Sequence, residues 1–216
     1  MKPNHSPLLP LFFFVLLLSA SCSTTKMLPP GEVLYTGIER IVVNDPANQR
    51  HRGADEVMGK VEEALAYEPN NALLGSSTTR TPLPIGLWVY NAHVGKKGRF
   101  HQWMYRWLAA RPVTLTTVKP ANRALAAQNV LHENGFFRGA ARYEIIPDHK
   151  DSLKARVRYL VTLGEPYMID SVRFRRMQGR NDTTIKWRDK DRLLHRGDLF
   201  TLDRLEAERQ RIATIM

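Results

Sequence analysis

The chain has 216 residues, which is enough for one ordinary domain or a few small ones. With 43% hydrophobic and 25% charged residues it has the composition of a folded globular protein, so disorder is excluded as its main state. It carries 32 basic against 21 acidic residues, a net charge of +11 at pH 7 that favours anionic partners. Its single cysteine excludes a disulfide framework and a cysteine-based zinc site within the chain.

The first residues predict an export signal that ends at this cysteine. Lys2 precedes an apolar run over 8–18, and small residues lead up to Cys22. A membrane-spanning helix needs about 20 apolar residues, so this shorter run is not an anchor. The five residues that end at Cys22 resemble a bacterial lipoprotein box. We expect a signal peptide over 1–21, lipidation of Cys22 and a tether over 22–32; the alternative is an ordinary secretory signal with an incidental cysteine.

A strand and a helix are the first elements predicted after the tether. Residues 37–43 are rich in β-branched side chains and are followed by a turn signal, Asn44-Asp45-Pro46. Over 54–67 the apolar residues recur at i, i+4, i+7 and i+8, which places them on one helical face: Val57, Val61, Ala64 and Leu65.

A loop, a short strand and an aromatic helix are expected next. The loop covers 75–84, which is rich in Ser, Thr and Pro, and the apolar run 85–90 predicts a strand. A helix is predicted over 99–110, with basic residues beside an apolar stripe made of Phe100, Trp103, Met104, Trp107 and Leu108. Two interpretations stay open: the helix lies on a lipid surface, or its stripe packs against a neighbouring sheet.

The following segment predicts a helix and a pair of strands. The helix covers 120–134 and ends at Gly135, which suits a left-handed stop; its apolar residues are Ala124, Leu125, Ala127 and Leu131. A strand over 142–146 and a turn lead to a second strand over 153–163. That strand alternates, which indicates one buried face, formed by Ala155, Val157, Tyr159 and Val161.

A last strand and helix complete the predicted elements. The strand covers 167–174. The helix is expected to be capped by Thr201 and has an apolar stripe made of Leu202, Leu205, Ile212 and Ile215.

Short motifs around these elements resemble the POTRA modules of the BamA/TamA family of outer-membrane assembly proteins. They are Asn134-Gly135-Phe136-Phe137 after a helix, 164–169 at the entry to a strand, and 197–200 before the last helix. Residues 22–35 and 68–75 are similar to the lipidated TamA-like branch. The resemblance implies an α+β fold of tandem β-α-α-β-β modules: a divergent one over 33–112, one over 113–164 and an incomplete one over 165–216.

The family continues into a transmembrane β-barrel, for which the remaining chain has no room. The chain is therefore expected to be the amino-terminal piece of a longer product or of a broken gene.

No catalytic, metal or cofactor motif is found, and we expect no enzyme. The seven histidines are scattered and Gly95-Lys96-Lys97-Gly98 lacks the spacing of a phosphate-binding loop. No Gly-x-Ser-x-Gly elbow occurs. The pairs Asp189/Asp191 and Glu206/Glu208 are interpreted as solvated faces.

The resemblance implies a periplasmic module, anchored to the outer membrane, that takes part in protein assembly or translocation. Its partners would be unfolded outer-membrane proteins or periplasmic assembly partners, bound as an added strand at an exposed sheet edge. The candidate edge comprises Arg142, Tyr143, Glu144, Ile145 and Ile146, with Phe136 and Phe137 at the helix-to-strand corner.

Anionic lipid is a further candidate partner because of the net charge, and export argues against nucleic acid. The alternatives are a free-standing lipoprotein that acts as a structural adaptor, a non-functional gene fragment and, with least support, a periplasmic hydrolase.

Overall fold

The structure, a computed structural model, describes residues 23–44, 53–173 and 189–215. The predicted signal peptide and Cys22 lie outside these residues. The chain forms two compact units whose segments alternate along the sequence. The first unit takes the residues up to Gly37, 68–118 and 147–156; the second takes 38–67, 119–146 and those from Val157 onward.

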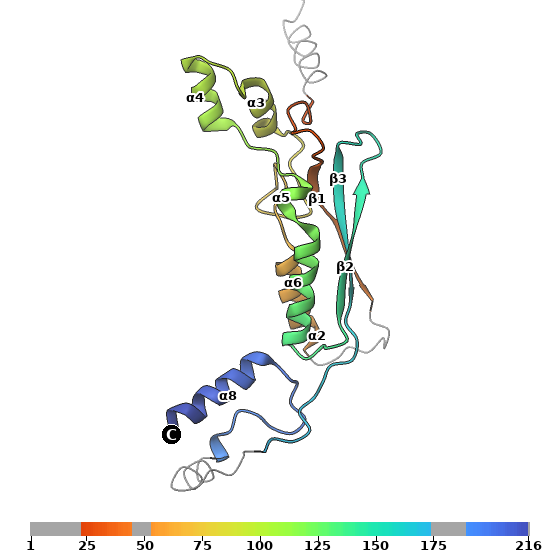
Figure 1. Cartoon of the computed structure of the whole chain (residues 1–216), viewed down its shortest axis with the longest axis vertical. Helices are drawn as coiled ribbons and strands as arrows, with labels where there is room; N and C mark the ends of the chain where they lie inside the picture. Colours follow the sequence, from red (N-terminus) through yellow and green to blue (C-terminus); the bar gives the residue numbers. More distant parts are fainter. Residues whose placement is uncertain (1–22, 45–52, 174–188, 216) are drawn as a thin grey trace, which may run out of the picture. The chain divides into compact units, whose positions relative to one another are not determined.

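A three-stranded sheet joins segments that are far apart in the sequence (Figure 1). Its strands are β1 (Leu34–Asn44), β2 (Ala140–Pro147) and β3 (Lys154–Thr162), in the order β1-β3-β2. A hairpin joins β2 to β3, whereas β1 runs parallel to β3: Leu34 N donates to Leu153 O (2.8 Å) at one end and Leu163 N to Asn44 O (3.3 Å) at the other. Hence β3 is central, and β1 and β2 are the two edges.

The core of the second unit lies between this sheet and two helices, α2 (Ala54–Leu65) and α6 (Pro120–Glu133), which pack side by side (Figure 1). Most residues of the predicted stripes are buried there: Val57, Val61 and Leu65 on α2, Ala124, Ala127 and Leu131 on α6, and all four alternating residues of β3; Ala64 is half-buried. Leu125 departs from its prediction, since it is 58% exposed. Gly135 ends α6 at φ 87°, which confirms the left-handed stop.

Between α2 and α6 the chain forms a helical insertion with α3 (Ile85–His93), α4 (Arg99–Leu108) and α5 (Leu115–Val118). The expected strand over 85–90 is wrong, because these residues begin α3. A short apolar run does not by itself distinguish a strand from a buried helix. Here α4 favours the helix: Ala110 N, just after α4, donates to Gly86 O (2.9 Å), and Leu87 is buried.

The sheet pairs residues that the sequence analysis placed in two modules. β1 belongs to the expected range 33–112, yet it is hydrogen-bonded to β3, from the range 113–164. Among the described residues, the order β-α-α-β-β is formed by β1, α2, α6, β2 and β3. A single strand forms no stable sheet of its own, and β1 gains one by pairing with β3. The α+β class is confirmed.

The last segment has little regular structure before its helix, α8 (Leu202–Ile215). Within the expected strand, residues 167–173 form only an isolated bridge, Met168 with Leu199; Phe174 lies outside the described residues. The predicted cap is confirmed, because Arg204 N donates to Thr201 Oγ1 (3.3 Å). Leu202 and Leu205 are 38% and 44% exposed. That this segment is an incomplete module stays a hypothesis.

Glu208 on α8 contradicts the expectation of a solvated face, because only 3% of it is exposed. Arg211 explains the burial: its Nε and Nη2 donate to the two carboxylate oxygens over 2.8 and 2.6 Å, and Leu193 N donates as well (3.0 Å). A buried carboxylate is tolerated when it is paired and hydrogen-bonded in this way. These bonds, Arg211 first, lower the pKa of Glu208.

Candidate functional site

The edge strand β2 is the candidate functional site. It contains all five residues of the predicted edge, from Arg142 to Ile146, and among the described residues it pairs with β3 alone. That this edge binds a partner stays a prediction; the structure places its residues together on a strand whose second side is open.

The opposite edge of the sheet is less open. At the start of β1, Tyr35 N donates to Val113 O (2.8 Å), and just before it Val33 O accepts from Leu115 N (3.0 Å). The segment after α4 therefore already forms backbone hydrogen bonds with this part of the edge. Along β2, by contrast, no backbone hydrogen bond to a segment other than β3 is found among the described residues.

The backbone of β2 presents donors and acceptors at regular intervals. In an antiparallel ladder, residues bonded to the neighbouring strand alternate with residues whose backbone groups point away. Asp148 N donates to Lys154 O (2.9 Å), which puts the even-numbered residues on the β3 side. The outward groups then belong to Ala141, Tyr143 and Ile145. Pro147 continues this series; having no N–H to leave unpaired, it suits an edge.

The side chains of Tyr143 and Ile145 lie uncovered on the helix-facing side of the sheet. Glu144 lies opposite Arg158, with which it forms an ion pair, so its two neighbours share the other face with Val157 and Tyr159. Those β3 residues are fully buried, whereas Tyr143 is 40% and Ile145 47% exposed. An added strand at this edge would cover both side chains.

On the other face, a charged triad connects the three strands. Arg158 on β3 donates through Nε to Glu39 of β1 (2.6 Å) and through Nη1 to Glu144 of β2 (3.3 Å). The hydrogen bond to Glu39 is the main reason why the pKa of Arg158 is raised. These groups are partly exposed, so the triad contributes to strand alignment more than to stability. Arg158 alternates with the predicted buried residues of β3, whereas nothing in the sequence indicated Glu39 as its partner, because 119 residues separate the two.

The two phenylalanines of the predicted corner differ in environment. Phe136 is fully buried in the core. Phe137 is 45% exposed, and its ring centroid lies 5.1 Å from that of Tyr167 and 5.2 Å from that of Phe200. Phe137 thus attaches residues after β3 to the end of α6, where Tyr167 N also donates to Gly135 O (2.9 Å).

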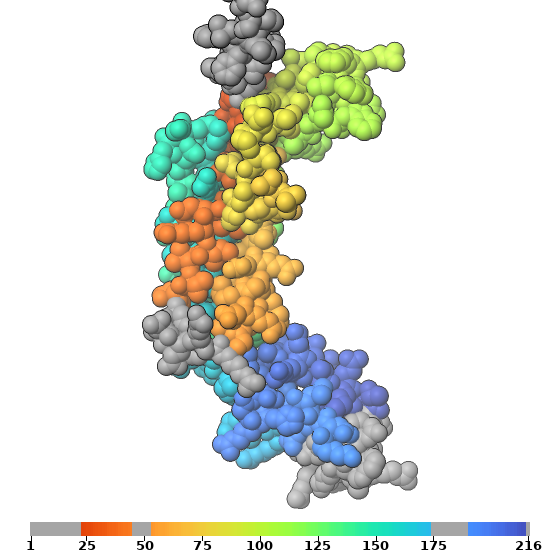
Figure 2. Space-filling model, turned by 180° about the vertical axis from the view of Figure 1, so that it is seen from behind, coloured from red at the N-terminus to blue at the C-terminus, as the bar shows by residue number. Residues whose placement is uncertain are grey.

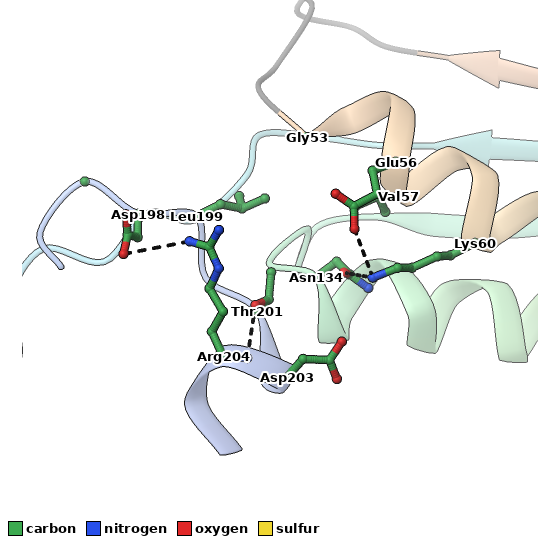
Figure 3. Close-up of a pocket in the computed structure, with 11 residues that line it drawn as sticks. Gly53, Glu56, Val57, Lys60, Asn134, Asp198, Leu199, Thr201, Asp203 and Arg204 are labelled. Atoms are coloured by element: carbon green, nitrogen blue, oxygen red, sulfur yellow. Dashed lines mark hydrogen bonds and ion pairs between the residues drawn. The ribbon is translucent and has the colours of Figure 1, made fainter. Parts of the chain in front are cut away.

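A hollow of about 500 Å³ lies at one end of α2 in the second unit (Figure 3). Most of its charged groups are engaged with other groups of the hollow: Lys60 Nζ lies 3.2 Å from Asn134 Oδ1 and 3.5 Å from Glu56, and Arg204 lies 3.8 Å from Asp198. The lining contains no Ser, Cys or His, so it offers no nucleophile paired with a histidine base. We assign it no activity.

Within the described residues, no three His, Cys, Asp or Glu side chains gather as metal ligands. His93 and His101 do meet, with 2.8 Å between their Nδ1 atoms, a contact between α3 and α4 that the scattered sequence positions did not indicate. No helix in the described part of the chain is both long and apolar enough to cross a membrane.

No protein-family model and no curated protein matches the chain. One solved structure, the crystal structure of Haemophilus influenzae BamA POTRA3-5, is similar over 87% of this chain and 88% of that chain, at 8% sequence identity and a TM-score of 0.30. A likeness this weak carries no argument about function or partners. The α+β assignment therefore rests on the strands and helices described above.

Proposed function

We propose that this chain is a periplasmic binding module that captures an extended segment of a protein partner along β2. The observation that carries the proposal is the free edge of β2, where the outward N–H and C=O groups of Ala141, Tyr143 and Ile145 are available for a new ladder. The sequence resemblance to the BamA/TamA family suggests the class of partner: unfolded outer-membrane proteins or periplasmic assembly partners.

Capture at this edge uses backbone hydrogen bonds for affinity, so it tolerates many client sequences. Tyr143 and Ile145 add an apolar strip, which favours clients with alternating apolar residues. Nothing in this mode requires a cofactor. Lipidation of Cys22 would hold the module at the periplasmic face of the outer membrane, so that clients meet it beside their destination.

Site-specific crosslinking tests the binding mode. A photoreactive amino acid at position 143, in the full mature chain, should crosslink to a urea-unfolded β-barrel precursor diluted into buffer. The control position is Glu62, which is exposed on α2 and is not part of the sheet. Equal crosslinking from both positions would contradict strand addition at β2.

A pair of substitutions at one residue separates backbone from side-chain binding. Ile145→Pro removes an outward N–H but takes no bond from β3, whereas Ile145→Ala keeps the N–H and loses only the side chain. We expect crosslinking through position 143 to be lost in the proline variant and largely kept in the alanine variant. Equal yields from the two would refute backbone capture, and circular dichroism shows whether the proline variant is folded.

The anchor is tested separately. Lipidation of Cys22 predicts a diacylglyceryl-modified mature amino terminus by mass spectrometry of the membrane fraction, and Cys22→Ser should abolish this modification. An unmodified Cys22 would exclude the lipoprotein prediction and would leave the β2 proposal standing.

A further inference from the structure

The helix α4 presents an uncovered aromatic face. Only one side of it packs, against α3: Tyr105 and Tyr90 have ring centroids 5.9 Å apart, and His101 meets His93. None of its residues is buried. The sequence left open whether its stripe packs on a sheet. Among the described residues, α3 contacts the histidine and tyrosine side of α4 and, at one end, Phe100, whose ring centroid lies 6.1 Å from that of His93.

Three large aromatic side chains form the exposed face. Phe100, Trp103 and Trp107 are 64%, 50% and 72% exposed. At 100° per residue they fall within one narrow arc of the helix, so they make a continuous strip. Figure 2 shows α4, in yellow-green, with its surface open on the face in view. An exposed strip of this kind marks an interaction surface.

The charges around the strip are all positive. Arg99 and Arg106 are exposed beside it, and Lys96 and Lys97 are exposed in the turn that leads into the helix. Moreover, the sequence has no Asp or Glu at all between Glu68 and Glu133. The strip and its surroundings therefore suit a partner that has an anionic surface over an apolar interior.

A further contact places this helix pair near the predicted anchor. Asn91 of α3 donates through Nδ2 to the carbonyl oxygen of Ser23 (2.8 Å). Ser23 directly follows Cys22, and consecutive Cα atoms lie about 3.8 Å apart. Ser23, which α3 contacts, is therefore only one residue away from the predicted anchor. Acyl chains on Cys22 would enter the membrane close to the pair of helices α3 and α4; this step rests on the proposed lipidation.

We propose that α4 docks flat on an anionic phospholipid bilayer, with Phe100, Trp103 and Trp107 inserted at head-group depth. Tryptophan and phenylalanine on one helix face, with basic residues beside them, are typical of helices that lie in the membrane interface. The four cations contact lipid phosphates. A helix of ten residues is about 15 Å long, far too short to cross a bilayer, so it lies in the interface.

The inference gives the membrane a second attachment. The diacylglyceryl group predicted at Cys22 would hold the end of the chain, and the basic, aromatic face of α4 would add a contact at a different point of the fold. Docking of α4 would also fix the orientation of the first unit against the membrane plane, which a lipid on a flexible terminus does not do.

The test uses the full mature chain with Cys22→Ser, so that acyl chains play no part and a failure of lipidation does not affect the result. Flotation with phosphatidylglycerol-containing vesicles should bring the protein to the top of the gradient, and pure phosphatidylcholine vesicles should bind it about ten-fold more weakly. Brominated lipids should quench tryptophan emission only in the first case.

Two double variants probe the two parts of the surface. Trp103→Ala/Trp107→Ala removes aromatic contacts and Arg99→Glu/Arg106→Glu reverses the charge; each should weaken vesicle binding about ten-fold or more. The matched controls are Leu73→Ala/Leu125→Ala, which removes exposed apolar side chains elsewhere, and Lys190→Glu/Arg209→Glu, which makes the same change of net charge. The controls should bind vesicles as the parent does.

Three results would overturn the proposal. They are no binding to anionic vesicles, equal losses in the α4 variants and their controls, and sedimentation showing that the aromatic strip forms a dimer that Trp103→Ala/Trp107→Ala dissolves. The last result would assign the strip to a second copy of this chain rather than to lipid. Circular dichroism of each variant shows whether a loss reflects unfolding.

Discussion

Two helices of this protein, α4 and α6, carry apolar residues at the same helical spacing, but the stripe of α6 is buried and that of α4 is largely exposed. On α6 the stripe is Ala124, Ala127 and Leu131, and all three are buried. On α4 the stripe is larger and more aromatic, and none of it is buried. Alanine lets α6 approach α2 closely, whereas bulky rings flanked by arginine suit a boundary between apolar and charged surroundings. Periodicity shows which face is apolar, and only the neighbours decide what covers it.

Truncating one residue in each helix tests the difference between α4 and α6 most directly. Leu131→Ala on α6 leaves a cavity in the core and should lower the free energy of unfolding by about 2–5 kcal/mol. Trp107→Ala on α4 removes a larger side chain, yet it should change stability by no more than about 0.5 kcal/mol. Urea unfolding of both variants measures this. Comparable losses would mean that α4 is covered in solution.

A third helix, α8, extends the comparison of buried helix faces, because the side chain that it buries is charged. Glu208→Gln weakens the pairing with Arg211 and should cost about 1–3 kcal/mol. The pKa of Glu208 is lowered in the folded chain, so its contribution is present above the ordinary glutamate pKa and is lost as pH falls through the folded value.

Chemical unfolding of the parent and the Gln variant, at pH 7 and in acid, checks both statements. The difference between the two should shrink in acid. A constant difference across this range would show that the carboxylate charge is not what matters.

A smaller effect is expected at Tyr159 of β3, whose side chain is buried in the core between the sheet and the helices α2 and α6. Burial raises its pKa to about 12, and its hydroxyl has no hydrogen-bond partner among the described residues. Removing an unsatisfied buried hydroxyl should be neutral or stabilising, by up to about 1 kcal/mol. Tyr159→Phe should therefore leave the thermal unfolding midpoint unchanged or slightly raised. A clear loss of stability would reveal a partner for this hydroxyl.

The smallest expected effect is local to α3 and α4. Burial is the main reason why the pKa of His93 is lowered, with the neighbouring His101 and then Lys96 adding to it. The folded chain thus binds a proton less readily than the unfolded one, so this contact is fully stable above the ordinary histidine pKa and weakens as pH falls below it. Once corrected for the intrinsic exchange rate, which itself falls in acid, amide exchange in α4 should become faster from pH 7 to 5.

His93→Gln removes the titrating ring and should abolish the pH dependence of this exchange. Amides of α6 serve as an internal reference, since no described feature of the histidine contact reaches them. Acceleration in both helices alike would point to general unfolding instead.

The sequence predicted most regular elements because each depends on local chemistry. Alternation identified β3, and Gly135 marked the end of α6 by its tolerance of positive φ. The prediction from sequence failed where contacts with neighbouring elements determine the structure. The run 85–90 became α3 because α4 holds it, and Glu208 became buried because Arg211 lies one helical turn away to pair with it.

The candidate site shows the same division. The residues of β2 were predicted from their pattern, and their place at the sheet edge follows from the order β1-β3-β2. The triad of Glu39, Arg158 and Glu144 depends on a strand pairing across more than a hundred residues. The contact of His93 with His101 depends on how two helices turn toward each other. No local signal encodes either arrangement.

By itself, the sequence determined most of the helices and strands, which faces are apolar and where positive charge gathers, because these follow from residue type and spacing. The tertiary structure alone decided that β1 joins β3, that β2 is left at an edge and that the aromatic face of α4 stays open. Those outcomes depend on which surfaces find a complementary partner in space, and spacing along the chain does not contain that information.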